Sequence, residues 1–124
     1  MMNKVETKNA PGAIGPYSQA VEIENLVYTS GQMGMTPDGV VLEGVEAQAR
    51  QAMENVKAIL AAAGLGMDRV IKTLVFLKDM GDFGTFNKIY AEYMTGSVLP
   101  ARSCVQVAAL PKNGLVEIEV IAKK

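Results

Sequence analysis

The stretch Val70-Ile71-Lys72-Thr73-Leu74-Val75-Phe76-Leu77 is rich in β-branched and aromatic residues and is apolar at nearly every position. An apolar run on both parities predicts a central strand that is covered on both faces or packed into a partner. The run lies between two segments with helical periodicity. This succession of helix, strand and helix decides the class of fold.

The flanking segments carry apolar residues three and four positions apart. The first predicts a helix over 45–63, with Gly64 as its C-cap. The second predicts a helix of similar length that runs from about Asp82, a candidate N-cap, to about Met94. Its buried stripe is expected to contain Phe83, Phe86, Tyr90, Tyr93 and Met94.

Further strands are predicted on both sides of this centre. Residues 21–30 alternate around Glu24-Asn25, which predicts two short strands joined by a tight turn, and a weaker strand is expected at 4–7. After the second helix, strands are predicted at 103–109 and 115–122.

The predicted order is β-β-β-α-β-α-β-β, an α+β pattern in one domain spanning residues 1–124. Two helices would cover one face of a mixed six-stranded sheet. The other face would have no cover from its own chain, and a bare apolar sheet face is a large exposed patch. We therefore expect this face to pack against other copies of the protein.

The composition excludes several classes of function. The 124 residues include 12 basic and 13 acidic side chains, so no electrostatic footprint for nucleic acid is present. There is no histidine, which removes Ser-His-Asp and Cys-His catalysis and zinc sites that need an imidazole, and no metal site is expected. Acid–base chemistry therefore falls to Glu, Asp, Tyr, Lys or Cys.

The compartment is indicated by the single cysteine, Cys104, which cannot form an intrachain disulfide. A reducing environment is the default for such a chain, and a cytoplasmic location is expected. The longest apolar run, 58–63, is only about six residues, so neither a secretion signal nor a membrane span is expected.

Three side chains on the last two strands are candidates for chemistry. Arg102, at a strand entrance, is either an ordinary surface residue or a planar donor for a substrate carboxylate. Glu117 and Glu119 share one strand face, which is either solvated or, in an oligomer, partly buried and suited to a general base. Cys104 shares the face of Arg102 and is more typical of a small buried side chain than of a nucleophile.

Six strings together resemble the RidA/YjgF family of reactive-intermediate deaminases over nearly the whole chain. The Pro-Ala-Arg-Ser-Cys string and the later Glu-Ile-Glu strand are the most specific to that family. The strings are Ala10-Pro11-Gly12-Ala13-Ile14-Gly15-Pro16-Tyr17-Ser18-Gln19-Ala20, Thr29-Ser30-Gly31-Gln32, Gln48-Ala49-Arg50-Gln51, Asn55-Val56-Lys57-Ala58-Ile59-Leu60, Pro100-Ala101-Arg102-Ser103-Cys104-Val105 and Val116-Glu117-Ile118-Glu119.

The resemblance implies a chorismate-mutase-like homotrimer with sheets inward, helices outward and three intersubunit clefts. It also implies a 2-iminobutanoate/2-iminopropanoate deaminase, which uses no cofactor and has neither a nucleic-acid nor a membrane partner. Its substrates would be 2-imino acids released by pyridoxal-phosphate-dependent dehydratases, and its products the 2-keto acid and ammonia.

By position, the resemblance also implies the residues of the cleft. Arg102 would grip the substrate carboxylate, and Glu117 would activate a water molecule. Substrate and water would further contact the backbone of Cys104 and the turn at 30–31, and Tyr17 would close the pocket. The full implied set is Tyr17, Ser30, Gly31, Asn87, Arg102, Cys104 and Glu117.

Strand geometry gives an independent expectation for Arg102 and Glu117. If their two strands are antiparallel, the residues lie at opposite ends, about 20 Å apart along the strands. One small substrate could then reach both only if they came from different subunits.

Two other functions are compatible with these residues. The first is a non-catalytic trimer that binds a small carboxylate or acts as a chaperone. The second is an endoribonuclease or translation inhibitor, which the missing histidines and the lack of a basic track disfavour.

Overall fold

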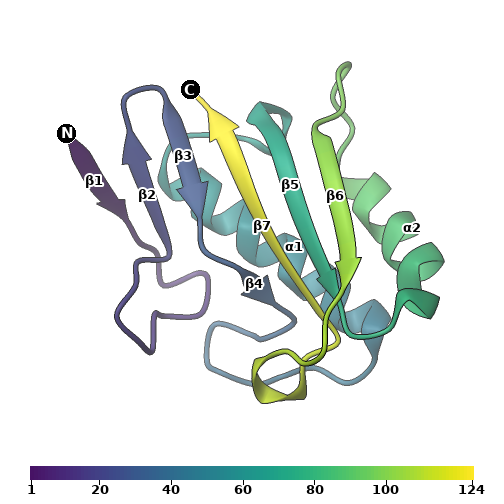
Figure 1. Ribbon diagram of the computed structural model, residues 1–124. Helices are drawn as coiled ribbons and strands as arrows, with labels where there is room; N and C mark the ends of the chain where they lie inside the picture. The colour runs from purple at the N-terminus through teal and green to yellow at the C-terminus, as the bar shows by residue number, and fades with distance from the viewer.

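The computed structural model describes residues 1–124 and contains one mixed sheet with both α-helices on the same face (Figure 1). In chain order the elements are β1 (Met2–Val5), β2 (Ala20–Ile23), β3 (Leu26–Thr29), β4 (Gln32–Met33), α1 (Val45–Ala62), η1 (Met67–Arg69), β5 (Val70–Leu77), η2 (Met80–Asp82), α2 (Phe83–Tyr93), β6 (Ala101–Gln106), η3 (Pro111–Asn113) and β7 (Val116–Lys123). The α+β single domain is therefore confirmed.

The strands of the sheet follow the order β1-β2-β3-β7-β5-β6, and β4 also pairs with β7. All pairs are antiparallel except β5 with β6, which are parallel because the chain crosses over through α2 between them. The last strand of the sequence thus lies in the middle of the sheet, where it adjoins β3, β4 and β5.

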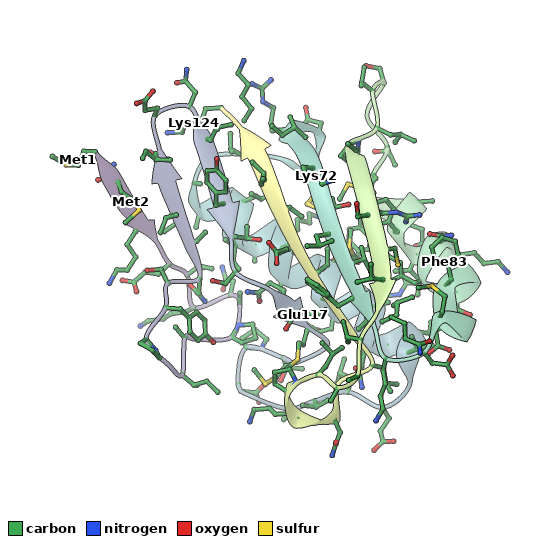
Figure 2. All side chains as sticks on the ribbon, in the orientation of Figure 1. Met1, Met2, Lys72, Phe83, Glu117 and Lys124 are labelled. Atoms are coloured by element: carbon green, nitrogen blue, oxygen red, sulfur yellow. The ribbon has the colours of Figure 1, made fainter.

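The predicted central strand is β5, with the same bounds as the sequence indicated. Thr73, Val75 and Leu77 are fully buried under the helices, whereas Lys72, Leu74 and Phe76 are only half-buried. The alternation arises because the chain covers one face of the sheet and leaves the other open, toward the viewer in Figure 2. The expected bare face is therefore present in the protomer.

Helix α1 follows its sequence prediction closely. Its apolar stripe supplies much of the core, and the helix ends one residue before the predicted boundary. Gly64 adopts a left-handed conformation (φ 79°) just after the C-cap, Ala63. There the Gly64 and Leu65 N–H groups donate to the carbonyls of Ala61 (2.9 Å) and Leu60 (2.8 Å), which satisfies the last turn.

The sheet has seven strands rather than the predicted six, because β4 adds a two-residue strand against β7. This strand is too short to produce a sequence pattern. Its formation is a long-range event: the chain leaves β3 at Ser30 and pairs Gln32 with Ile118 and Met33 with Glu117.

The helices are not of similar length, since α1 has 18 residues and α2 has 11. A short 3-10 turn precedes α2, and Asp79 rather than Asp82 makes the side-chain cap there, accepting from the Gly81 N–H at 2.8 Å. Phe83 was expected in the buried stripe but is 37% exposed, because it lies at the helix start beside the edge strand β6. Neither helix is long and apolar enough to cross a membrane.

Candidate functional site

The seven candidate residues fall into two groups on opposite faces of the sheet. One group, the basic half-site, consists of Asn87, Arg102 and Cys104 on the helix-covered face. The other, the acidic half-site, consists of Tyr17, Ser30, Gly31 and Glu117 on the open face or in the loops at its edge.

The basic half-site is built by β6 and α2. Arg102 pairs in register with Thr73 of β5, whose side chain points toward the helices, so its own side chain lies on that face. One guanidinium nitrogen of Arg102 donates to Asn87 Oδ1 at 2.7 Å. The guanidinium carbon lies 4.8 Å from the ring centroid of Tyr90 and 5.4 Å from that of Phe83.

Arg102 has no acidic partner within the chain, because the three ion pairs of the protomer involve other residues. A guanidinium has five N–H donors, and Asn87 occupies one of them. A half-buried cation with free donors in a fixed fork is suited to receive an anion, and its planar shape matches a carboxylate.

Cys104 lies two residues further along β6 and packs against the hydrophobic core. Burial raises the pKa of its thiol, and the positive charge of Arg102 offsets part of that rise. The thiol therefore stays protonated at neutral pH, which agrees with the prediction that Cys104 is not a nucleophile.

The acidic half-site is formed where the loop between β1 and β2 and the turn between β3 and β4 meet the start of β7. Ser30 links these loops: its hydroxyl donates to the Ser18 carbonyl at 2.6 Å, and its N–H donates to the Gln19 carbonyl at 2.8 Å. These bonds hold the segment that carries Tyr17 beside the turn that carries Gly31.

Glu117 lies on β7 at the foot of the open face (Figure 2). Burial raises the pKa of its carboxyl above the ordinary value, and the nearby negative charge of Glu119 raises it further. Gly31 lies directly against this carboxylate, since a Cβ at Gly31 would be 2.6 Å from Glu117 Cδ. Only a residue without a side chain fits there while Glu117 keeps its position.

A cleft of about 240 Å³ brings three of these residues together. Tyr17, Gly31 and Glu117 line it, with Ile14 and Met33 among its apolar walls. Such a cleft could hold a small molecule whose reactive atom approaches the Glu117 carboxylate.

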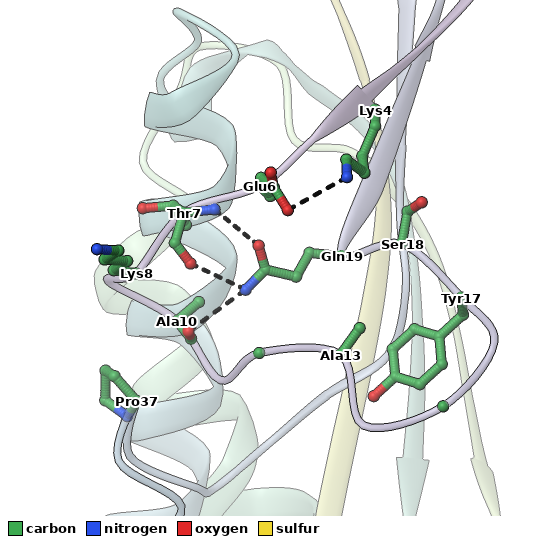
Figure 3. Close-up of a pocket in the computed structure, with 12 residues that line it drawn as sticks. Lys4, Glu6, Thr7, Lys8, Ala10, Ala13, Tyr17, Ser18, Gln19 and Pro37 are labelled. Carbon is green, nitrogen blue, oxygen red and sulfur yellow. Dashed lines mark hydrogen bonds and ion pairs between the residues drawn. The ribbon is translucent and has the colours of Figure 1, made fainter.

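A larger hollow of about 830 Å³ lies beside the loop between β1 and β2 and shares Tyr17 with this cleft (Figure 3). It contains neither Glu117 nor Arg102. We take the smaller cleft as the candidate site because it holds the carboxylate whose pKa burial raises.

No single protomer brings the two half-sites together. Glu117 is the register partner of Phe76 and Arg102 that of Thr73, on strands either side of β5. The two residues are thus offset along the strands by roughly 10 Å, not by about 20 Å. Across the sheet, β6 and β7 are about 10 Å apart, because β5 lies between them. The expected along-strand distance was wrong because the pairing of β6 with β5 could not be read from the sequence. The two side chains are instead kept apart by lying on opposite faces of the sheet.

The chain is similar to known proteins in both sequence and structure. The family model described as Endoribonuclease L-PSP matches residues 7–124. A crystal structure of a Yersinia pestis protein of the conserved Rid protein family has a TM-score of 0.97 and 47% identity, covering all of both chains. The chain belongs to the Rid family.

Two other relatives of this Rid-family chain carry names that bear on chemistry. A Salmonella typhimurium protein named 2-iminobutanoate/2-iminopropanoate deaminase is 52% identical over 98% of both chains. A crystal structure of Escherichia coli TdcF with bound serine has a TM-score of 0.94 and 47% identity, covering 98% of each chain. The resemblance seen in the sequence motifs is thereby confirmed.

One residue of the site region had no assigned role in the sequence analysis. Gln19 is 4% exposed and ties down the loop that carries Tyr17 (Figure 3). Its side chain accepts from the Thr7 N–H at 2.7 Å and donates to the carbonyls of Thr7, Ala10 and Pro11. Its place inside the first family-like string was the available signal, but a polar residue there looks like ordinary loop chemistry.

Replacing Gly31 with alanine is expected to lower kcat for a reaction in this cleft by about 10²-fold, because the new methyl group displaces the Glu117 carboxylate. The melting temperature should change little, since the nearest atoms all belong to the Glu117 side chain and none to the backbone. Gly84→Ala is the matched control, because a Cβ at Gly84 meets nothing within 4 Å and Gly84 does not line the cleft. Equal activity of the Gly31 and Gly84 variants would contradict this account of the site.

Proposed function

We propose that this Rid-family protein hydrolyses small 2-imino acids to 2-keto acids and ammonia without a cofactor. The observation that carries the proposal is Arg102, a half-buried guanidinium that has no acidic partner and is fixed by Asn87 and two aromatic rings. It is supported by the names of relatives that are about half identical to the chain over almost its whole length.

In the proposed reaction Arg102 holds the substrate carboxylate and places the C=N carbon near Glu117. The Glu117 carboxylate takes a proton from water while the water oxygen bonds to that carbon. Glu117 passes this proton to the imine nitrogen, which gives a tetrahedral intermediate with one hydroxyl and one amino group. The hydroxyl proton then moves to the amino group, the C–N bond breaks, and ammonia leaves as the C=O group forms. No electrons are gained or lost, so water is the sole co-reactant.

The remaining residues of both half-sites would shape the pocket. Asn87 fixes Arg102, Tyr17 closes the cleft, and the 30–31 turn and the Cys104 backbone offer hydrogen bonds to substrate and water. The pocket holds these groups in position before the substrate arrives, which is how positioning lowers a barrier.

The proposal requires an oligomer, because Arg102 and Glu117 of one protomer lie on opposite faces of the sheet. We infer a homotrimer in which the basic half-site of one subunit meets the acidic half-site of its neighbour. The exposed apolar side chains of the open face support this assembly: Tyr28 is 40% and Val105 is 42% exposed. Each such contact joins unlike surfaces, and a ring of three such contacts closes.

Cleavage of RNA is not favoured by any feature of the molecule, although the matching family model is described as an endoribonuclease. The chain has no histidine, and its net charge is −1. It offers neither the usual acid–base group nor a basic track to hold a phosphate backbone.

The test couples a threonine dehydratase to semicarbazide, which traps the imine before it hydrolyses. Addition of the protein should suppress formation of the semicarbazone while 2-oxobutanoate and ammonia still accumulate. Unchanged trapping would contradict the enzyme proposal and leave a carboxylate-binding or chaperone role for the fold.

The pH profile gives a prediction for Glu119, whose charge helps to raise the pKa of Glu117. Glu117 acts only as the carboxylate, so activity should fall as the pH drops through its raised pKa. Glu119→Gln removes one negative charge and lowers that pKa, so the acidic limb should move to lower pH. Trapping assays across the acidic range, corrected for imine supply at each pH, measure the shift. An unmoved limb, or one moved to higher pH, would contradict the role of Glu117.

A further inference from the structure

We propose that Tyr90 and Thr73 are positioning residues that hold the Arg102 guanidinium in the orientation needed to bind a carboxylate. The inference rests on the proposed function, because it concerns how the carboxylate-binding group of that site is kept in place. Neither residue is part of the seven-residue set. Both act through Arg102 rather than on the substrate.

A pair of hydrogen-bonded hydroxyl groups lies next to Arg102. Thr73 is fully buried, and its hydroxyl lies 2.9 Å from the Tyr90 hydroxyl, the one side-chain hydrogen bond that either residue makes. Thr73 is also the residue of β5 directly beside Arg102 in the sheet. The bond therefore ties α2 to the central strand at the level of Arg102.

The Tyr90 ring is fixed at more than one point. Its hydroxyl end is held by Thr73, and its ring packs against the buried Phe86 at a centroid distance of 5.6 Å. The Arg102 guanidinium carbon then lies 4.8 Å from the Tyr90 centroid, within the range of a cation–π contact.

The residues that contact Arg102 are regularly spaced along α2. Phe83, Asn87 and Tyr90 stand at positions four and three apart, so they share one stripe of the helix. The two rings contact the guanidinium, and the amide oxygen accepts one of its N–H groups. None of the three carries a negative charge that would compete with a substrate carboxylate for Arg102.

The test compares Tyr90→Leu, Tyr90→Phe, Thr73→Val and Thr73→Ser with the unaltered protein. Tyr93→Phe is the matched control, because Tyr93 lies on the same helix but bonds to Glu54 instead of contacting Arg102. One readout is kcat and KM for imine hydrolysis. The other is the NMR signal of the Arg102 Nε–H group, which the neighbouring rings should shift and which requires no substrate.

Tyr90→Leu should raise KM about tenfold with little change in kcat, since carboxylate binding is weakened equally in the ground and transition states. Tyr90→Phe and Thr73→Val should each raise KM about threefold. The two changes combined should raise KM by less than the product of their single effects. Thr73→Ser keeps the hydroxyl group and should bring KM most of the way back to that of the unaltered protein. The Arg102 signal should move toward its ordinary position in Tyr90→Leu and stay in place in Tyr93→Phe.

The inference is overturned if Tyr90→Leu leaves both KM and the Arg102 signal unchanged, or if Tyr93→Phe costs as much as Tyr90→Phe. A failure of the proposed function is a different result, namely an unaltered protein that hydrolyses no imine. In that case the Arg102 signal alone decides whether Tyr90 positions the guanidinium.

Discussion

Arg102→Ala is expected to lower kcat/KM for imine hydrolysis by about 10³-fold. The variant removes a cation that no acidic side chain of its own chain neutralises, so the substrate carboxylate would be left without its partner. Arg102→Lys should recover only a small part of the activity, because an ammonium lacks the planar fork that meets both carboxylate oxygens.

Trapping of the dehydratase product by semicarbazide, with each variant at equal concentration, measures this loss. Sedimentation must show the same assembly for each variant, so that a lost oligomer is not mistaken for a lost carboxylate contact. An Arg102→Ala variant that assembles normally and retains even a tenth of the activity would remove Arg102 from the reaction.

Much of the fold could be predicted from local patterns. The run 70–77 gave β5 with its observed bounds, and the apolar spacing with Gly64 gave α1 to within one residue. These elements were accessible because helix and strand periods, and a glycine in a left-handed conformation, leave marks within a short window. The open sheet face was also predictable, because two helices that lie on one side of a sheet leave the other side uncovered.

The missed features depend on contacts between distant segments. Strand β4 exists only because Gln32 and Met33 reach β7, and the place of Arg102 along the sheet depends on the pairing of β6 with β5. Exposure of Phe83 follows from the position of α2 beside the edge strand. Such long-range pairing leaves no local mark in a sequence.

The sequence likewise predicted only part of the site. Parity along each strand placed Arg102 with Cys104 and Glu117 with Glu119, and the structure has both pairs so arranged. Parity within a strand does not show which face of the sheet each pair occupies. The opposite placement of Arg102 and Glu117 therefore needed the strand registers, as did the approach of Gly31 to Glu117.

The central claim is that each active site combines Glu117 of one subunit with Arg102 of the next. The measurement that tests it most directly mixes two variants, Arg102→Ala and Glu117→Gln, each of which should be almost inactive alone. Unfolding the two together and refolding them at equal concentration yields mixed trimers. In a closed ring of three, about a quarter of the sites should then regain both intact residues.

We predict recovery of about a quarter of the unaltered activity in the mixture. The matched control mixes Arg102→Ala with the double variant Arg102→Ala/Glu117→Gln, which cannot form an intact site and should stay inactive. Mixed trimers no more active than their parents, in a preparation where the refolded unaltered protein is fully active, would contradict a site shared between subunits.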